Sequence, residues 1–229
     1  QRALTENKFF ITQGREKNAR RDVPFITNGL QSTLELLKDT LGKAIDSSAT
    51  LIIPDEIICS QPSDSLFRIM MHRSDNFFAE QTLLMAANEK LGVQDDRQMM
   101  QYLLTNDLAG FPQKPRWADG SGLSRYNLFT PRDFVWILHK MKTEFGMERL
   151  EQIFPTAGSG TLQYYFPDHP IRVYAKTGSM SDVWSLSGYL YTKAGRLLIF
   201  SVMVNKPRRP ASAIRKKIEA FLYHMSLAY

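Results

Sequence analysis

The sequence predicts an α+β protein in which helices come first and a small antiparallel sheet follows. Apolar residues recur three and four positions apart through much of 64–143, which is the spacing of amphipathic helices. Two apolar segments, 183–192 and 197–204, flank Lys193-Ala194-Gly195 and predict a hairpin. A final helical pattern runs over 211–229. Separation of helices from strands along the chain is typical of α+β domains.

Residues 1–60 carry a pattern of their own. We predict a strand over 8–12, a loop or hairpin over 13–22, and a helix over 29–42 with Asn28 as its N-cap. Two short apolar segments, 51–53 and 57–58, predict strand interrupted by Pro54. A cluster of turn formers follows at Ser60–Asp64, so we expect one domain over 1–60 and a second over 61–229.

The second domain is predicted to hold several helices before its strands. Thr130-Pro131 combines a helix N-cap with proline at the first helical position. The segment 199–204 is apolar nearly throughout, which predicts a central strand covered on both faces. The remaining predictions are helices over 64–72, 75–91, 96–107 and 131–143, a long loop over 109–129, and a strand over 171–176.

The composition limits the classes of function. The chain has 229 residues, of which 43% are hydrophobic, enough for one substantial core and a smaller appendage. No stretch approaches the ~18 apolar residues of a transmembrane segment. The net charge of +6 comes from scattered basic residues without interleaved aromatics, so we expect no nucleic-acid partner. The single cysteine, Cys59, excludes a disulfide within the chain and is predicted to be a small core residue.

Two tripeptides carry the chemistry. Ser74-Asp75-Asn76 falls at the opening of a predicted helix, and Lys176-Thr177-Gly178 at the end of a predicted strand, just before the hairpin. Each is weak alone, since Ser74 could be a plain N-cap and Lys176 a solvated strand residue. Together, in this order, and with a preceding S-x-x-K, they are the signature of penicillin-binding proteins and class A β-lactamases.

Acyl transfer from a peptide ending in D-Ala-D-Ala would use a serine, an asparagine and a lysine of the kind found at Ser74, Asn76 and Lys176. The reaction needs a nucleophile, a proton path to the leaving amine and a cation for the substrate carboxylate. The Ser74 hydroxyl can relay a proton, and the Asn76 amide can hold a peptide carbonyl. Lys176 can supply positive charge to both the serine relay and the carboxylate. We therefore predict Ser74, Asn76 and Lys176 as catalytic residues.

The residues that follow Lys176 suit substrate binding. Thr177 can give a hydroxyl to the carboxylate, and Gly178 removes a side chain where the substrate lies against the strand. The backbone can then pair with the substrate as an added strand, with the N–H of Ser179 as one oxyanion donor. We predict Thr177, Gly178 and Ser179 as substrate-binding residues.

Four segments extend the resemblance to a family. Residues 73–81, 119–132, 158–162 and 176–180 resemble, in that order, motifs of the DacB-like D-alanyl-D-alanine carboxypeptidases of peptidase family S13. The resemblance is good over 60–229 and looser before. It implies part of a penicillin-binding, serine β-lactamase-like transpeptidase fold, in which 1–60 is the returning end of an inserted domain.

The resemblance also implies an activity. A relative of this kind removes the terminal D-alanine of peptidoglycan stem peptides, with possible cleavage of cross-bridges, through an acyl-serine intermediate. It implies β-lactam antibiotics as ligands, no metal or organic cofactor, and a periplasmic or cell-envelope location.

The sequence departs from the family in one respect. No lysine has a serine three positions before it, and the nearest match is Thr5-Glu6-Asn7-Lys8. We expect the S-x-x-K segment to precede Gln1 in the intact protein and this chain alone to be inactive. A non-catalytic peptidoglycan-binding pseudoenzyme remains an alternative. A serine β-lactamase is a second one, disfavoured by residues 119–132.

Several other polar residues are predicted to be structural. The histidines lack metal-ligand spacing, so we expect no metal site, and His72 is predicted on a helix surface. Glu80 is predicted to lie on a helix face or to contact residues that line the site, rather than act as a base, and Asp119 to shape the cleft. Trp184 and Tyr189 are predicted to pack on the sheet.

Overall fold

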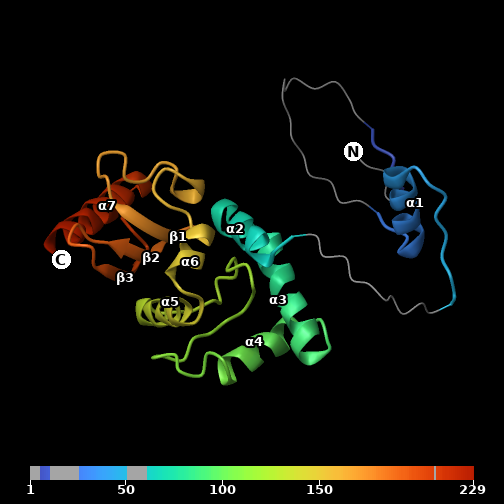
Figure 1. Cartoon of the computed structure of the whole chain (residues 1–229), viewed down its shortest axis with the longest axis horizontal. Coiled ribbons are helices and arrows are strands. Elements are labelled where there is room, and N and C mark those ends of the chain that lie inside the picture. Colours follow the sequence, from blue (N-terminus) through green and yellow to red (C-terminus); the bar gives the residue numbers. More distant parts are fainter. Residues whose placement is uncertain (1–5, 11–25, 51–60, 209) are drawn as a thin grey trace. The chain divides into compact units, whose positions relative to one another are not determined.

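The computed structural model describes residues 6–10, 26–50, 61–208 and 210–229 (Figure 1). The chain divides into two compact units, Gln1–Ile58 and Cys59–Tyr229. The predictions for the 13–22 loop, the strand segments 51–53 and 57–58, residues 11 and 12 of the first predicted strand, and Cys59 lie outside the described residues.

The first unit contains the predicted helix as α1, Leu30–Leu41. Gly42 ends it in a left-handed conformation at φ 62°, and its N–H donates to the Lys38 carbonyl. The N-cap is Gly29, so the prediction of Asn28 was wrong. The Asn28 backbone N–H, one residue before the cap, instead donates to the Ser32 hydroxyl oxygen at 2.8 Å.

The second unit holds the remaining elements in the predicted order. Its helices confirm the periodic pattern, and two short elements near the sheet, α6 and η1, were not predicted. The helical elements are α2 Ser63–Arg73, α3 Asn76–Leu91, α4 Asp96–Thr105, α5 Pro131–Phe145, α6 Met147–Ile153, the 3-10 turn η1 Gly160–Leu162, and α7 Ala211–Ala228.

Three antiparallel strands form the sheet in the order β1-β2-β3, namely Arg172–Met180, Val183–Tyr191 and Leu197–Asn205. The predicted end of the first strand at 176 was wrong, because pairing with β2 continues through Met180. Lys176 therefore lies within β1, opposite Ser187, and not at its end. Residues 177–180 include a glycine and two polar residues, so apolar periodicity did not predict this part of the strand.

Among the described strands, β2 is central and β3 lies at the outer position, so the prediction of 199–204 as a central strand was wrong. Its apolar character has another cause. Ile199 packs with the cluster on the α5 side, whereas Phe200 and Val202 pack with the cluster on the α7 side. Both faces of β3 are covered even though its outer edge has no partner in the described part of the chain.

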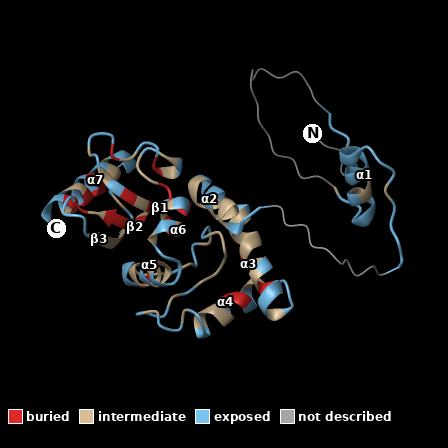
Figure 2. Cartoon of the chain, viewed as in Figure 1, coloured by how far each residue is buried: buried red, intermediate tan, exposed pale blue. Residues whose placement is uncertain are grey.

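Two hydrophobic clusters fix the sheet between helices (Figure 2). On one face Val173, Ala175 and Leu186 pack with Leu222 of α7. On the other face Tyr189 lies fully buried, and its hydroxyl donates to the Leu138 carbonyl of α5 at 2.7 Å. The prediction that Tyr189 packs on the sheet is confirmed.

A third cluster joins α3 to α4 through Leu83, Ala87, Met99 and Met100. In the described segments, no helix combines the length and the apolar character needed to cross a membrane.

Candidate active site

A sharp corner between α2 and α3 presents Ser74. This residue ends α2 in a left-handed conformation, φ 54° and ψ 51°, which is unusual for a residue other than glycine. Asp75 then begins the next helix, since its carboxylate accepts the Phe78 N–H at 3.0 Å. The alternative that Ser74 is the N-cap is therefore wrong: Asp75 has that role, and the Ser74 hydroxyl is left for other contacts.

Lys176 reaches this corner from the sheet. Its Nζ lies 2.7 Å from the Ser74 Oγ and 2.7 Å from the carbonyl oxygen of Thr177. An ammonium group can only donate, so the Ser74 oxygen accepts this hydrogen bond and keeps its own proton for another acceptor. The two residues, 102 positions apart in sequence, thus form one polar pair.

Burial changes the acidity of this lysine. Loss of hydration disfavours the charged form and lowers the pKa of Lys176 from 10.5 to about 8. A group with this pKa is still mostly protonated at pH 7, yet it gives up a proton far more readily than a surface lysine. Such tuning is common where a side chain takes part in proton transfer.

The outer edge of β1 is free beside Lys176. The Ala175 N–H donates to the Pro155 carbonyl at 2.9 Å, so it points away from β2. Backbone groups alternate in direction along an antiparallel strand, so the N–H groups of Thr177 and Ser179 point to the same outer edge. No described residue pairs with them. The edge can therefore accept an added strand, with the Ser179 N–H as a donor.

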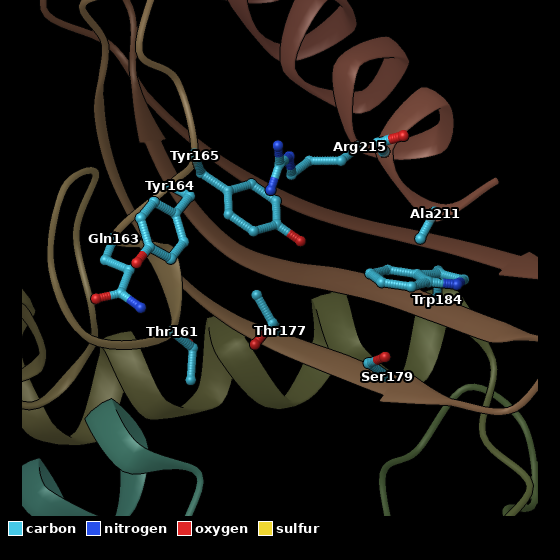
Figure 3. A pocket seen from close by; sticks show the side chains of 10 residues that line it. Thr161, Gln163, Tyr164, Tyr165, Thr177, Ser179, Trp184, Ala211 and Arg215 are labelled. Carbon is cyan, nitrogen blue, oxygen red and sulfur yellow. The ribbon is translucent and has the colours of Figure 1, made fainter.

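The side chains of the motif lie on opposite faces of β1. Thr177 and Ser179 line a pocket on the face covered by α7 (Figure 3), whereas Lys176 turns to Ser74. A Cβ on Gly178 would lie 2.2 Å from the Ser185 hydroxyl oxygen on the neighbouring strand. A side chain at this position would therefore force the Ser185 hydroxyl to rotate away, a cost independent of any substrate.

Asn76 occupies the first position of α3, exposed to solvent. Among the described residues, none forms a hydrogen bond with its side-chain amide. One turn later, the Glu80 carboxylate accepts the N–H groups of Gly120 and Ser121, at 3.1 and 2.9 Å. Glu80 therefore ties the 119–124 loop to the helix that presents Asn76.

Asp119 holds the same loop in shape. Its two carboxylate oxygens accept the N–H groups of Gly122 and Ser124, both at 2.6 Å, and one also accepts the Asn127 side-chain amide at 3.0 Å. With its oxygens so occupied, Asp119 acts as an organiser of the loop.

His72 is partly buried against the glycine turn, residues 158–162, so the prediction that it lies on a helix surface was wrong. A Cβ on Gly160 would lie 2.9 Å from both the His72 Nδ1 and its carbonyl oxygen. Burial, more than the nearby Arg68 charge, lowers the pKa of His72, while a hydrogen bond to the Phe154 backbone opposes that shift. The imidazole therefore joins the end of α2 to the segment that caps β1.

Several residues near the site gave no sequence signal. The pocket beside Thr177 and Ser179 has a volume of about 430 Å³. Trp184, predicted to pack on the sheet, lies in β2 and also lines this pocket. The other lining residues are Thr161, Gln163, Tyr164, Tyr165, Ala211, Ser212 and Arg215. No cluster of three or more potential metal ligands occurs within the described ranges.

Known proteins share parts of this chain. It is 34% identical over 93 residues to the D-alanyl-D-alanine carboxypeptidase DacB of Haemophilus influenzae, covering 38% of this chain and 19% of that protein. It is 42% identical over 77 residues to the penicillin-sensitive carboxypeptidase A of Dictyostelium discoideum, covering 31% and 15%.

Solved structures establish the fold. Penicillin-binding protein 4 of Haemophilus influenzae superposes with a TM-score of 0.62 at 23% identity, over 87% of this chain and 50% of that one. A predatory endopeptidase of Bdellovibrio bacteriovorus gives 0.58 at 19% identity, over 72% and 43%. A class A β-lactamase of Bacteroides cellulosilyticus gives 0.51 at 17% identity, over 71% and 61%. The α+β arrangement is thus that of the penicillin-binding and β-lactamase-like proteins, as predicted.

The chain spans about half the length of the penicillin-binding protein and less of the sequence relatives. The family model of the D-Ala-D-Ala carboxypeptidase 3 (S13) peptidases matches residues 34–225, which include both tripeptides and the glycine turn. The chain belongs to the D-Ala-D-Ala carboxypeptidase 3 (S13) family.

Proposed function

We propose that this chain supplies the proton-relay and substrate-binding half of a serine-type D-alanyl-D-alanine peptidase that acts on peptidoglycan stem peptides. The observation that carries the proposal is the 2.7 Å contact between the Lys176 ammonium and the Ser74 hydroxyl, beside the free edge of β1. A half-buried lysine held against a serine next to an open strand edge suits acyl transfer to and from a peptide.

The direction of the hydrogen bond suggests how the proton moves. Ser74 accepts from Lys176, so its own O–H is free to point into the cleft. When the peptide bond breaks, Ser74 can give that proton to the leaving amine and take one from Lys176 in return. The lowered pKa of Lys176, about 8, eases this transfer.

The remaining residues are proposed to position the substrate. The exposed Asn76 amide would hold a peptide carbonyl, and the Thr177 hydroxyl would bind the terminal carboxylate. The outward N–H of Ser179 would be one oxyanion donor, 2.7–3.1 Å from the charged oxygen. Gly178 would keep the strand surface flat where the substrate lies.

The acyl-forming serine is proposed to lie outside residues 1–229, in an S-x-x-K segment of a longer protein. Residues 1–60 would then be the returning end of an inserted domain, and 61–229 the C-terminal part of the peptidase domain. The proposal includes acylation by β-lactams and a periplasmic or cell-envelope location, in keeping with the penicillin-binding relatives.

Labelling with a fluorescent penicillin tests the proposal. A longer protein that includes the upstream S-x-x-K should carry the label covalently, because its serine can attack the β-lactam carbonyl. The 229-residue chain alone should remain unlabelled, and so should the longer protein after replacement of that serine by alanine.

Three results would contradict this assignment. Covalent label on the 229-residue chain would show a nucleophile among its own residues. No label on a folded longer protein would favour the non-catalytic, peptidoglycan-binding alternative. Cleavage of the label within seconds would instead indicate a β-lactamase.

A further inference from the structure

The pocket on the α7 face of β1 is larger than the terminal D-alanine requires. Its volume is about 430 Å³, whereas a methyl group is comparable in size to one water molecule, ~30 Å³. Pockets of several hundred Å³ hold whole ligand groups rather than single methyls. Because Thr177 and Ser179 line its rim, a group attached to the leaving residue of the substrate would lie next to it.

The walls of the pocket combine aromatic rings with one cation. Figure 3 shows Thr177 and Ser179 along one side and Arg215 along the other, with the rings of Tyr165 and Trp184 on the two flanks. The Arg215 guanidinium lies over the Tyr165 ring, 5.5 Å from its centroid. The Tyr165 ring shields the cation from water on one side.

Arg215 retains hydrogen-bonding capacity. Its closest carboxylate is that of Glu219, with 3.5 Å between Nε and Oε1, too long and too poorly directed for a hydrogen bond. The terminal N–H groups have no acceptor within the described parts of the chain, and the side chain is 34% exposed. A guanidinium can bind a carboxylate through two parallel N–H groups, so Arg215 can accept a second anion.

A second unpaired polar atom lies in the same wall. The Thr161 hydroxyl is buried and has no hydrogen-bond partner among the described residues. Buried polar atoms nearly always find a partner, so this hydroxyl is an exception, but its oxygen is shielded from solvent. Thr161 therefore forms part of the wall, and recognition of a charged ligand depends on Arg215.

Resting on the proposed function, we infer that this pocket is a leaving-group subsite for a residue whose side chain is longer than that of alanine and ends in a carboxylate, with Arg215 as the residue that recognises the charge. The aliphatic part of such a side chain would lie between Tyr165 and Trp184. The substrate class would thus include stem peptides whose leaving residue carries a second carboxylate.

Direct binding to the 229-residue chain tests this inference without requiring any acylation. Three acylated tripeptides would be compared that differ only in the last residue: D-alanine, D-glutamine or D-glutamate. With 5-fluorotryptophan incorporated, ¹⁹F NMR reports on Trp184, whose resonance is assigned by Trp184→Phe. We expect the D-glutamate peptide to shift this resonance and to bind about tenfold more tightly than the D-glutamine peptide.

Matched variants separate charge recognition from general effects. Arg215→Gln combined with Glu219→Gln keeps the pocket neutral and should abolish the preference for D-glutamate. Lys216→Gln removes one charge from an exposed position on the same helix and should leave the preference intact. Arg215→Lys keeps the charge but loses the planar pair of donors, so we expect an intermediate preference.

The inference is overturned by equal affinity for the D-glutamate and D-glutamine peptides, by a preference that survives the double variant, or by failure of all three peptides to bind the folded chain. Penicillin labelling of the longer protein remains an independent readout. Label without a D-glutamate preference would reject the subsite and keep the peptidase, whereas absence of label would reject the peptidase.

Discussion

Ser74 adopts a backbone conformation that costs about 1 kcal/mol for a residue with a Cβ, and glycine would avoid this cost. The corner between α2 and α3 would therefore form more easily without the serine. Its hydroxyl, however, is the acceptor for the Lys176 ammonium. The local cost is consistent with a residue retained for its side chain, as is common at functional sites.

The charge on Lys176 gives a prediction on pH dependence. Its pKa of about 8 lies below the usual 10.5, so the ammonium form is lost as the pH rises through 8. In the longer protein, acylation by penicillin should decline over that range, because both the charge for the carboxylate and the proton for Ser74 are lost. Stopped-flow acylation rates from pH 6 to 10 would measure the decline.

Two substitutions sharpen this test. Lys176→Ala should slow acylation by about a hundredfold or more at pH 7. Lys176→Arg stays charged, so whatever rate it retains should show no decline near pH 8. Near-normal acylation by Lys176→Ala, or an unchanged decline in Lys176→Arg, would rule out the proposed role.

At the scale of elements, the 119–124 loop depends on α3. The Glu80 carboxylate accepts two backbone N–H groups of that loop, and no other carboxylate contacts them in the described chain. Glu80→Ala should lower the free energy of unfolding by about 1–3 kcal/mol, because two part-buried donors lose their partner. Urea denaturation would measure this loss.

Amide exchange would locate the effect. The Gly120 and Ser121 amides should exchange faster in Glu80→Ala, whereas Glu89→Ala, an exposed position on the same helix, should change neither exchange nor stability. Unchanged exchange at Gly120 and Ser121 would show that other contacts hold the loop.

The elements also show what sequence can and cannot predict. Thr130-Pro131 begins α5 as predicted, because a capping box and a proline act within one turn: Thr130 and Asp133 exchange hydrogen bonds. The place of β3 at the outer position could not be read, since apolar residues report covered faces and not strand order. The order of strands in a sheet depends on which strands pair with each other, and the residues of one strand alone do not reveal its partners.

Some features of the candidate site could be predicted from the sequence, and others could not. The pairing of Ser74 with Lys176 was predictable because two motifs carry it. The Pro155 cap on β1 was not, since a backbone carbonyl leaves no trace in residue identity. Arg215 was not either: it lies in a helix near the end of the chain, and only folding brings it to Thr177.

At the scale of the whole molecule, the outer edge of β3 has no partner strand in the described sheet. The alternation that directs Ala175 outward on β1 also directs the N–H groups of Ile199, Ser201 and Met203 outward on β3. Such an apolar edge can pair with another chain. We therefore expect the 229-residue chain to self-associate through β3 at high concentration.

A pair of substitutions at one position tests this expectation by sedimentation velocity. Met203→Pro removes an outward N–H and should weaken self-association. Met203→Ala shortens the side chain but keeps the N–H and should self-associate like the original chain. Equal behaviour of the two variants, with circular dichroism unchanged in both, would show that strand pairing is not the cause.

The hydrogen bond from the Ala175 N–H to the Pro155 carbonyl limits the length of the β1 edge that a peptide can pair with. Upstream of Lys176 the edge is occupied, and beyond Met180 the strand ends. A bound peptide can therefore pair with β1 over about five residues, or about 17 Å. The Pro155 segment limits the pairing at one end, and the end of β1 at Met180 limits it at the other. Under the proposed function, only a short segment of the substrate beside the scissile bond would pair with this strand.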